Sequence, residues 1–429
     1  MTSHRFAVFS PTVPPTQKAH AILLARILQL VPSERYILIS NKPVDSGLAQ
    51  EERYFYLPTA QTATREAEIA AANKLEGVLG AVENPALLKS MRVLLRFYRK
   101  VKTFTGRLRA HLQNHNATIT AHAARLETIL QHEQINLLVV CSGGNVHNLP
   151  AAYLAAQRLS IPLIVYLFDY YSREMFAEQF VARQWEERIL RSAAAIIVNN
   201  EGQRDIYRQV YGLESTVLYN PCELDFSPGG SKPYLRQDVF NIVYTGSVWG
   251  IHHDGFRRLA QAVNRLGDMV CLHIFSGNPS FIFRLQGIEG PQIAVHSPLP
   301  QDEVYQVQHE ADLLVLAFSF DGTFEEILSA TLTTKLGEYL AAGRPILVHA
   351  PPDTFVNKYL RQHNSGIVVD QPDVAALVTA LQTLMNDDSL RTTLGQRARA
   401  CAEADFDSQK MSERFAQIVS QVSGTQFYL

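Results

Sequence analysis

The sequence predicts an α/β protein built from two Rossmann-like, doubly wound domains in tandem. Its 429 residues exceed what one hydrophobic core usually holds and suit two domains of about 200 residues each. Short apolar runs alternate with helix-like segments in both halves of the chain, a pattern typical of parallel sheets with helices on both faces. A segment rich in proline and glycine, at 226–233, separates the two halves.

The first half contains five predicted strands. Each is a short run of apolar and β-branched residues, as expected for a parallel strand buried on both faces. Helix-like segments such as 18–30 and 149–159 lie between them. The predicted strands are 6–9, 36–39, 137–140, 163–168 and 194–198.

The second half repeats this alternation. Helices are expected at 255–266 and 374–385, where apolar residues recur with helical spacing. The predicted strands are 241–245, 270–275, 293–295, 313–317, 346–348 and 366–369. Two sheets of the same kind are therefore expected, one in each half of the chain.

These elements set the predicted domain boundaries. The first domain covers 1–225 and carries a basic, helical insertion at about 59–130. A linker at 226–235 leads into a second domain at 236–407. The remaining segment, 408–429, is expected to form a final helix.

Charge and cysteine usage exclude several classes of protein. The net charge of -2 gives no overall field that would attract nucleic acid. The four cysteines are far apart and form no C-x-x-C pair, so neither a zinc ribbon nor a dense disulfide framework is indicated. A reducing, cytoplasmic location is the natural expectation. The cysteines are Cys141, Cys222, Cys271 and Cys401.

The chain shows no targeting or membrane-spanning segment. Its first residues run almost directly into a strand-like segment, without the long apolar region of a secretory signal. No apolar run approaches the 18 or so residues that a spanning helix needs. The protein is therefore not expected to cross a bilayer, although it could lie against one.

The most informative segment of the chain is 333–348. Thr333 or Thr334 can cap a helix, Gly343 can end it in a left-handed conformation, and Pro345 prevents its continuation into the next strand. A helix N-terminus offers free N–H groups to a diphosphate, and Glu338, one turn inside, can accept hydrogen bonds from both hydroxyls of a ribose. The alternative is that Glu338 faces solvent on an ordinary amphipathic helix.

This segment also resembles a known family. Its wording, KLGEYLAAGRPIL, is similar to the donor-site helix of retaining glycosyltransferases of the two-domain GT-B fold, especially the family 4 type. The resemblance implies two domains that face each other across a cleft, with the final helix crossing back to the first domain. It also implies that Thr333, Thr334, Lys335 and Glu338 contact a nucleotide-sugar donor.

The chain departs from the family pattern in two features. The first of its paired glutamates would stand eight positions before Glu338, where this chain has Ala330. Glu325 or Glu326 could replace it, and we take Glu326 as a candidate catalytic residue. The alternative is that these two acids simply cap a surface helix.

The second departure concerns the phosphate-binding arginine and lysine of the family, which are replaced here by Ser247 and Asp254. If the charge of the diphosphate is neutralised, then Lys335, Arg257 or Arg258 must contribute, or backbone amides must do more.

A second donor-side segment is the strand and loop at 242–250. A glycine-containing loop after a strand lets the backbone approach a phosphate or a sugar closely, so Gly246, Ser247 and Trp249 are predicted donor contacts. The alternative is a plain turn between a strand and a helix.

The first domain has two loops that could meet the acceptor. The loop at 142–148 is rich in glycine, and the next strand ends at Asp169. In the enzymes that the chain resembles, these loops border the sugar and the acceptor. Gly144 and His147 are therefore candidate acceptor contacts, and Asp169 is a candidate general base or hydroxyl-orienting group. A buried Asp or His that holds loops together is the alternative.

The predicted insertion carries a basic, amphipathic stretch at 89–109. Such a helix can sit among anionic lipid headgroups, so peripheral contact with the inner face of a membrane is one prediction. A solvated helix packed on the sheet is the alternative, and nothing else supports nucleic-acid binding. The basic residues are Lys89, Arg92, Arg96, Arg99, Lys100, Lys102, Arg107 and Arg109.

The predicted function is transfer of a hexose-type sugar, with retention, from a nucleoside diphosphate sugar to a hydroxyl. The acceptor would be a glycan or a lipid-linked precursor in polysaccharide or glycolipid biosynthesis. No cofactor beyond the co-substrate is expected, and no metal site, since no Asp-x-Asp pair follows a strand. The alternatives are a nucleotide-sugar epimerase or hydrolase of the same fold and a non-catalytic sugar-nucleotide-binding scaffold.

Overall fold

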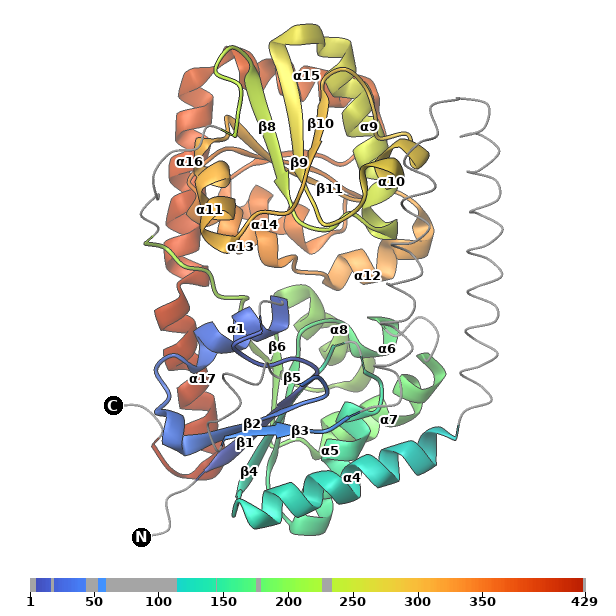
Figure 1. Cartoon of the computed structure of the whole chain (residues 1–429), viewed down its shortest axis with the longest axis vertical. Coiled ribbons are helices and arrows are strands. Elements are labelled where there is room, and N and C mark those ends of the chain that lie inside the picture. Colours follow the sequence, from blue (N-terminus) through green and yellow to red (C-terminus); the bar gives the residue numbers. More distant parts are fainter. Residues whose placement is uncertain are drawn as a thin grey trace.

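The computed structural model consists of two α/β domains stacked along the long axis of the molecule (Figure 1). It describes residues 5–16, 19–43, 53–58, 114–143, 145–174, 179–225 and 234–426. The predicted stretch at 89–109 and Gly144 lie outside the described residues, as does most of the predicted linker.

The N-terminal sheet has seven parallel strands in the order β3-β2-β1-β4-β5-β6-β7. These are β1 (Phe6–Ser10), β2 (Tyr36–Ser40), β3 (Tyr54–Tyr56), β4 (Leu137–Cys141), β5 (Leu163–Leu167), β6 (Ala195–Val198) and β7 (Thr216–Val217). The described helices are α1 (Ala19–Leu28), α4 (His115–His132), α5 (Asn148–Leu159), α6 (Tyr171–Glu174), α7 (Gln179–Ser192) and α8 (Glu201–Tyr211), with a 3-10 turn, η1 (Ser33–Arg35).

The C-terminal sheet has six parallel strands in the order β10-β9-β8-β11-β12-β13. These are β8 (Phe240–Thr245), β9 (Val270–Phe275), β10 (Ile293–His296), β11 (Leu313–Ala317), β12 (Ile346–His349) and β13 (Ile367–Val369). The helices are α9 (Gly250–Leu266), α10 (Ser280–Leu285), α11 (Gln301–Glu310), α12 (Glu325–Ala330), α13 (Thr334–Ala341), α14 (Phe355–His363), α15 (Val374–Asn386) and α16 (Asp388–Cys401), with 3-10 turns η2 (Gly267–Met269) and η3 (Gly322–Phe324).

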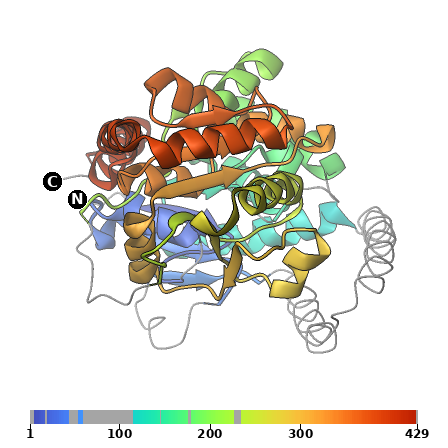
Figure 2. The same cartoon turned by 90° about the horizontal axis from the view of Figure 1, so that it is seen from above.

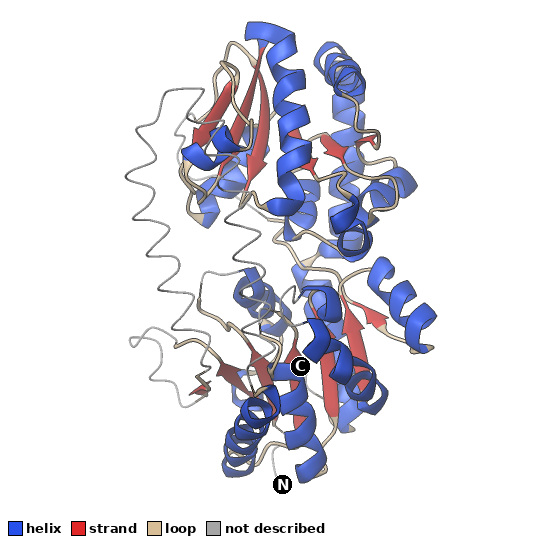
Figure 3. Ribbon diagram, turned by 90° about the vertical axis from the view of Figure 1, so that its right-hand side faces the viewer, coloured by secondary structure: helices blue, strands red, loops and turns tan. Residues whose placement is uncertain are grey.

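Burial explains why these segments form parallel strands. The strands β1, β4, β5, β9 and β11 are buried along their whole length, as continuous apolar runs should be when helices cover both faces of a sheet. Helices lie on both sides of each sheet in Figure 3. The predicted fold class of two doubly wound domains is confirmed.

The final helix, α17 (Ser408–Ser423), returns to the N-terminal domain. A π-helical turn, η4 (Ala402–Phe406), joins it to α16. Ser412 on α17 donates its hydroxyl to the Ile27 carbonyl at 2.8 Å and accepts from the Leu30 amide at 3.1 Å. Figure 2 shows α17 at one side of the molecule, away from α4. The predicted crossing of the last helix is therefore confirmed.

Helix α4 overlaps the predicted insertion. Residues 115–130 belong to this helix, which packs on α5 through a face that includes Ile119, Leu126 and Leu130. They therefore form part of the layer that covers the N-terminal sheet. Within the described residues, no helix has the length and apolarity needed to cross a membrane.

Candidate functional site

The candidate site lies where the two sheets present their carboxyl ends. In each sheet the strand order reverses at one point, between β1 and β4 in the N-terminal domain and between β8 and β11 in the C-terminal domain. Open parallel sheets bind ligands in the crevice outside the strand ends at such a point. The loops after β4, β8 and β11 are therefore the places where predicted site residues should gather, and Figure 1 shows α12 and α13 facing the N-terminal domain.

Helix α13 begins and ends as the sequence predicts. It starts at Thr334, with Thr333 as the N-cap in an extended conformation, and the Thr333 hydroxyl makes no capping bond. After the last helical residue, Gly343 has φ +64°, the left-handed conformation that glycine adopts easily. The first amides of α13 therefore lack the side-chain cap that Thr333 could have supplied.

Lys335 packs directly against the glycine loop that follows β8. Gly246 has φ +119°, and a Cβ there would lie 2.4 Å from Cε and 3.0 Å from Nζ of Lys335. The ammonium also lies 5.3 Å from the centre of the Tyr244 ring. Burial lowers the pKa of Lys335, and the Glu338 carboxylate partly opposes this. The site therefore holds a cation at the junction of the loop and the helix.

The two arginines proposed as alternatives are engaged elsewhere. Arg258 donates to Asp254 at 2.6 Å, and Arg257 donates to the Gln286 carbonyl at 2.7 Å. Asp254 also accepts the Phe320 amide at 3.0 Å, so it fixes the loop after β11. Of the three candidate cations, Lys335 is the one that contacts the Gly246 loop.

Glu338 lies inside the molecule at the domain boundary. Its side chain is 16% exposed, and its Oε1 accepts from Gln301 Nε2 at 3.4 Å and lies 3.8 Å from Arg26 Nη1. Burial raises the pKa of Glu338, while Arg26 and Lys335 act in the opposite direction. These contacts exclude the alternative in which Glu338 simply faces solvent.

Ser247 and Trp249 form the exposed rim of the Gly246 loop. The Ser247 carbonyl accepts a hydrogen bond from the Tyr244 hydroxyl at 2.8 Å. The Ser247 residue is exposed. Trp249 is 44% exposed, a large fraction for this side chain. Both residues are positioned to meet a ligand that approaches the end of β8.

Glu326 faces the N-terminal domain. It stands in the first turn of α12, and its carboxylate pairs with Arg173 of α6 at 2.5 Å. Ala330, at the other end of α12, is buried, and its carbonyl accepts the Asn200 amide group at 2.8 Å. The position of the missing first glutamate is thus part of a packed domain contact.

Asp169 lies at the carboxyl edge of the N-terminal sheet, close to His20, which the sequence did not single out. His20, at the start of α1, has its Nε2 4.0 Å from Asp169 Oδ2 and its ring stacked on Phe168 at 4.8 Å. A Cβ at Gly143 would lie 2.6 Å from the His20 ring. Burial lowers the pKa of His20 to about 4, so the ring is neutral near pH 7. The signal for His20 was its place just after the first strand, at the point where the strand order reverses.

His147 is placed differently from its prediction as an acceptor contact. It is buried, and its Nε2 lies 2.9 Å from Nδ1 of His115 on α4, with His122 near its ring. Burial, helped by the charges of His115 and His122, lowers the pKa of His147 to about 4. These contacts match the alternative in which a buried histidine holds elements together. Over the described ranges, no group of three His, Cys, Asp or Glu residues is arranged to hold a metal ion.

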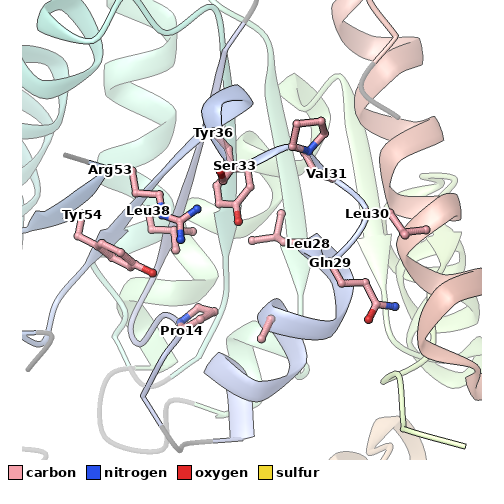
Figure 4. A pocket seen from close by; sticks show the side chains of 12 residues that line it. Pro14, Leu28, Gln29, Leu30, Val31, Ser33, Tyr36, Leu38, Arg53 and Tyr54 are labelled. Carbon is pink, nitrogen blue, oxygen red and sulfur yellow. The ribbon is translucent and has the colours of Figure 1, made fainter. Parts of the chain in front are cut away.

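One pocket of about 500 Å³ lies away from the strand ends just described. Figure 4 shows it between the end of α1 and the strands β2 and β3. Its wall includes Leu28, Tyr36, Arg53 and Tyr54, and Arg53 lies over both tyrosine rings. None of the predicted site residues lines it.

Comparison with known proteins identifies both halves of the chain. The family described as "Glycosyl transferase 4-like domain" matches residues 76–222, a range that includes part of the predicted insertion. The family described as "Glycosyl transferases group 1" matches residues 239–387. The chain is a glycosyltransferase with the GT-B fold.

Solved structures share this fold at low sequence identity. The Anabaena protein Alr3699/HepE, solved with UDP, is 13% identical with a TM-score of 0.62, over 97% of this glycosyltransferase and 100% of that chain. Sucrose-phosphate synthase from Thermosynechococcus elongatus is 12% identical with a TM-score of 0.68, over 98% and 100%. A putative UDP-N-acetylglucosamine 2-epimerase from Listeria monocytogenes is 12% identical with a TM-score of 0.58, over 98% of each chain. No curated protein matches the sequence.

Proposed function

We propose that this glycosyltransferase binds a nucleoside diphosphate sugar against α13 and moves its hexose unit to a hydroxyl acceptor with retention. The observation that carries the proposal is the position of Glu338. It lies one turn inside α13, and Lys335 in the first turn of that helix packs against the Gly246 loop. A carboxylate at that distance from a phosphate-binding helix start suits a ribose.

The diphosphate would meet three kinds of donor. The amides at the start of α13 carry the partial positive charge of the helix, Lys335 adds a full charge, and Ser247 adds a hydroxyl. A bound anion would also offset the burial that lowers the pKa of Lys335. Structures of Alr3699/HepE with UDP, with UDP and glucose, and with UDP-glucose are consistent with such a ligand in this fold.

The same groups would assist the reaction. As the bond between sugar and phosphate breaks, negative charge grows on the departing diphosphate, and fixed donors at that position lower the barrier. Asp169, with the neutral ring of His20 beside it, would orient a hydroxyl of the sugar or the acceptor from the other domain. Glu326, held by Arg173, would serve the same purpose from α12.

We also propose that the basic residues of 89–109 contact a membrane. A glycan or lipid-linked acceptor would bring the enzyme to the cytoplasmic face of a membrane, where the basic residues of 89–109 could meet anionic lipid. Sedimentation with anionic vesicles tests this contact. Binding that falls as salt rises would support it, because such attraction is screened, and equal binding to neutral and anionic vesicles would remove it.

A thermal-shift screen tests the donor site. UDP, GDP, UDP-glucose and GDP-mannose would be added to the wild type, to Glu338→Ala and to Glu413→Ala. Glu413 is an exposed carboxylate on α17 and serves as the matched control. We expect at least one nucleotide to stabilise the wild type and the control but not Glu338→Ala. Equal stabilisation of all three proteins would show that the donor lies elsewhere.

Product analysis tests the reaction. Incubation with the donor alone should release little free sugar and no epimer, whereas a hydroxyl acceptor should give a glycoside whose anomeric configuration matches the donor. Rapid formation of an epimer without an acceptor would favour the epimerase alternative. An inverted glycoside would contradict retention.

A further inference from the structure

Arg26 of the N-terminal domain reaches into the nucleotide-binding half of the molecule. Its side chain, on α1, is only 11% exposed. Nη1 donates to the Pro221 carbonyl at 2.8 Å, and Nη2 donates to the Tyr305 hydroxyl on α11. Nε lies 3.3 Å from Glu223, and Nη1 lies 3.8 Å from Glu338. One guanidinium therefore joins α1, the segment after β7, α11 and α13.

We propose that Arg26 is a positioning residue for the donor site, which keeps Glu338 ionised and aimed at the ribose. Because Arg26 belongs to the opposite domain, nucleotide binding on α13 would depend on the two domains being together. The inference rests on the proposed function, since it concerns the residue that would hold the ribose.

The charges around Glu338 show why Arg26 matters. The carboxylate is largely buried, and burial by itself favours its protonated form. Arg26 and Lys335 oppose this, and Gln301 and Gln308 add hydrogen-bond donors from α11. Without Arg26, Lys335 would be the remaining cation that lowers the pKa of Glu338 among the described residues. Other titratable groups also surround this carboxylate. They are Tyr305, Cys222, Tyr339 and Glu223.

The geometry leaves capacity for a ribose. Both Arg26 and Gln301 approach Oε1 of Glu338, and a carboxylate has about four acceptor positions on its two oxygens. Arg26 can therefore remain in place while ribose hydroxyls donate to the same group. Its anchors on Pro221 and Tyr305 fix the planar guanidinium, which a lysine could not reproduce.

The test is calorimetric titration of UDP, and of GDP in parallel, between pH 5.5 and 8.5. We expect Arg26→Met to weaken nucleotide binding about tenfold or more at pH 7. The pH below which binding is lost should also rise. The sign follows from ionisation: without Arg26 the pKa of Glu338 rises further, so the binding form exists only at higher pH. Arg26→Lys should recover part of the affinity.

Two further variants keep the test decisive. Glu413→Gln removes an exposed carboxylate on α17, away from Arg26, and should leave both affinity and pH profile unchanged. Tyr305→Phe removes one anchor without opening a cavity and should weaken binding modestly even if Arg26→Met fails to fold. Wild-type affinity and an unchanged pH profile in both Arg26→Met and Tyr305→Phe would overturn the inference. If instead the wild type binds neither nucleotide, the proposed donor site is wrong. That outcome differs from failure of the Arg26 inference alone, in which the wild type binds and the variants bind equally well.

Discussion

At the scale of single residues, the three predicted carboxylates differ in the side chains that they face. Glu338 faces Arg26 and Lys335, Glu326 faces Arg173, and Asp169 faces His20, whose ring is neutral near pH 7. A buried carboxylate between cations, such as Glu338, can hold a polar ligand. Glu326 is more exposed, and its pair with Arg173 joins two domains at the surface. Sequence spacing alone predicts the carboxylates but not these partners.

Substitution of Lys335 should weaken binding of the diphosphate but not of the nucleoside. Lys335→Met should weaken UDP binding by about 1–3 kcal/mol, because a hydrogen bond to a charged phosphate is lost. Uridine carries no phosphate, so its affinity should hardly change. Calorimetry with both compounds measures this, and Arg258→Met is the matched control because Arg258 pairs with Asp254. An equal loss for uridine would mean that Lys335 acts on the fold and not on the phosphate.

At the scale of elements, the sequence predicts most of the fold because burial and strand formation coincide here. The segments of β1, β4, β8, β9 and β11 are mostly apolar, and each became an interior strand. The edge strands β3 and β7 were missed because they are short and only partly buried. Two or three residues carry too little pattern to predict a strand.

Helix α4 carries a prediction about pH. His147 holds α5 to His115 of α4, and its pKa is lowered to about 4 by burial and by its histidine neighbours. The unfolded chain, with an ordinary histidine pKa near 6.5, binds more protons between these two values. The free energy of unfolding should therefore fall as pH drops below 6.5, by about 1–2 kcal/mol at pH 5 from this residue.

Urea denaturation at pH 7.5 and pH 5 checks this expectation. His147→Gln removes the titrating group, so its free energy of unfolding should lose less between the two pH values than that of the wild type. His132→Gln is the control, since His132 is an exposed histidine on α4. Identical pH dependence in His147→Gln and the wild type would show that this histidine does not titrate with folding.

At the scale of the whole molecule, contacts between the domains could not be predicted. Arg26 and Glu338, Arg173 and Glu326, and Asn200 and the Ala330 carbonyl join segments far apart in the chain. Side-chain periodicity reports which face of an element is buried, but not which element of another domain covers it. The site was therefore predicted as separate loops, and His20 and Arg26 were missed because their importance depends on what lies opposite.

The proposed function requires a nucleotide held between α13 and the Gly246 loop. The most direct measurement is a crystal structure of the protein with UDP bound. We expect both ribose hydroxyls to donate to the Glu338 carboxylate, with the diphosphate against Lys335 and the first amides of α13. UDP bound at another place, with Glu338 contacted by Arg26 and Gln301 and not by the ribose, would contradict it.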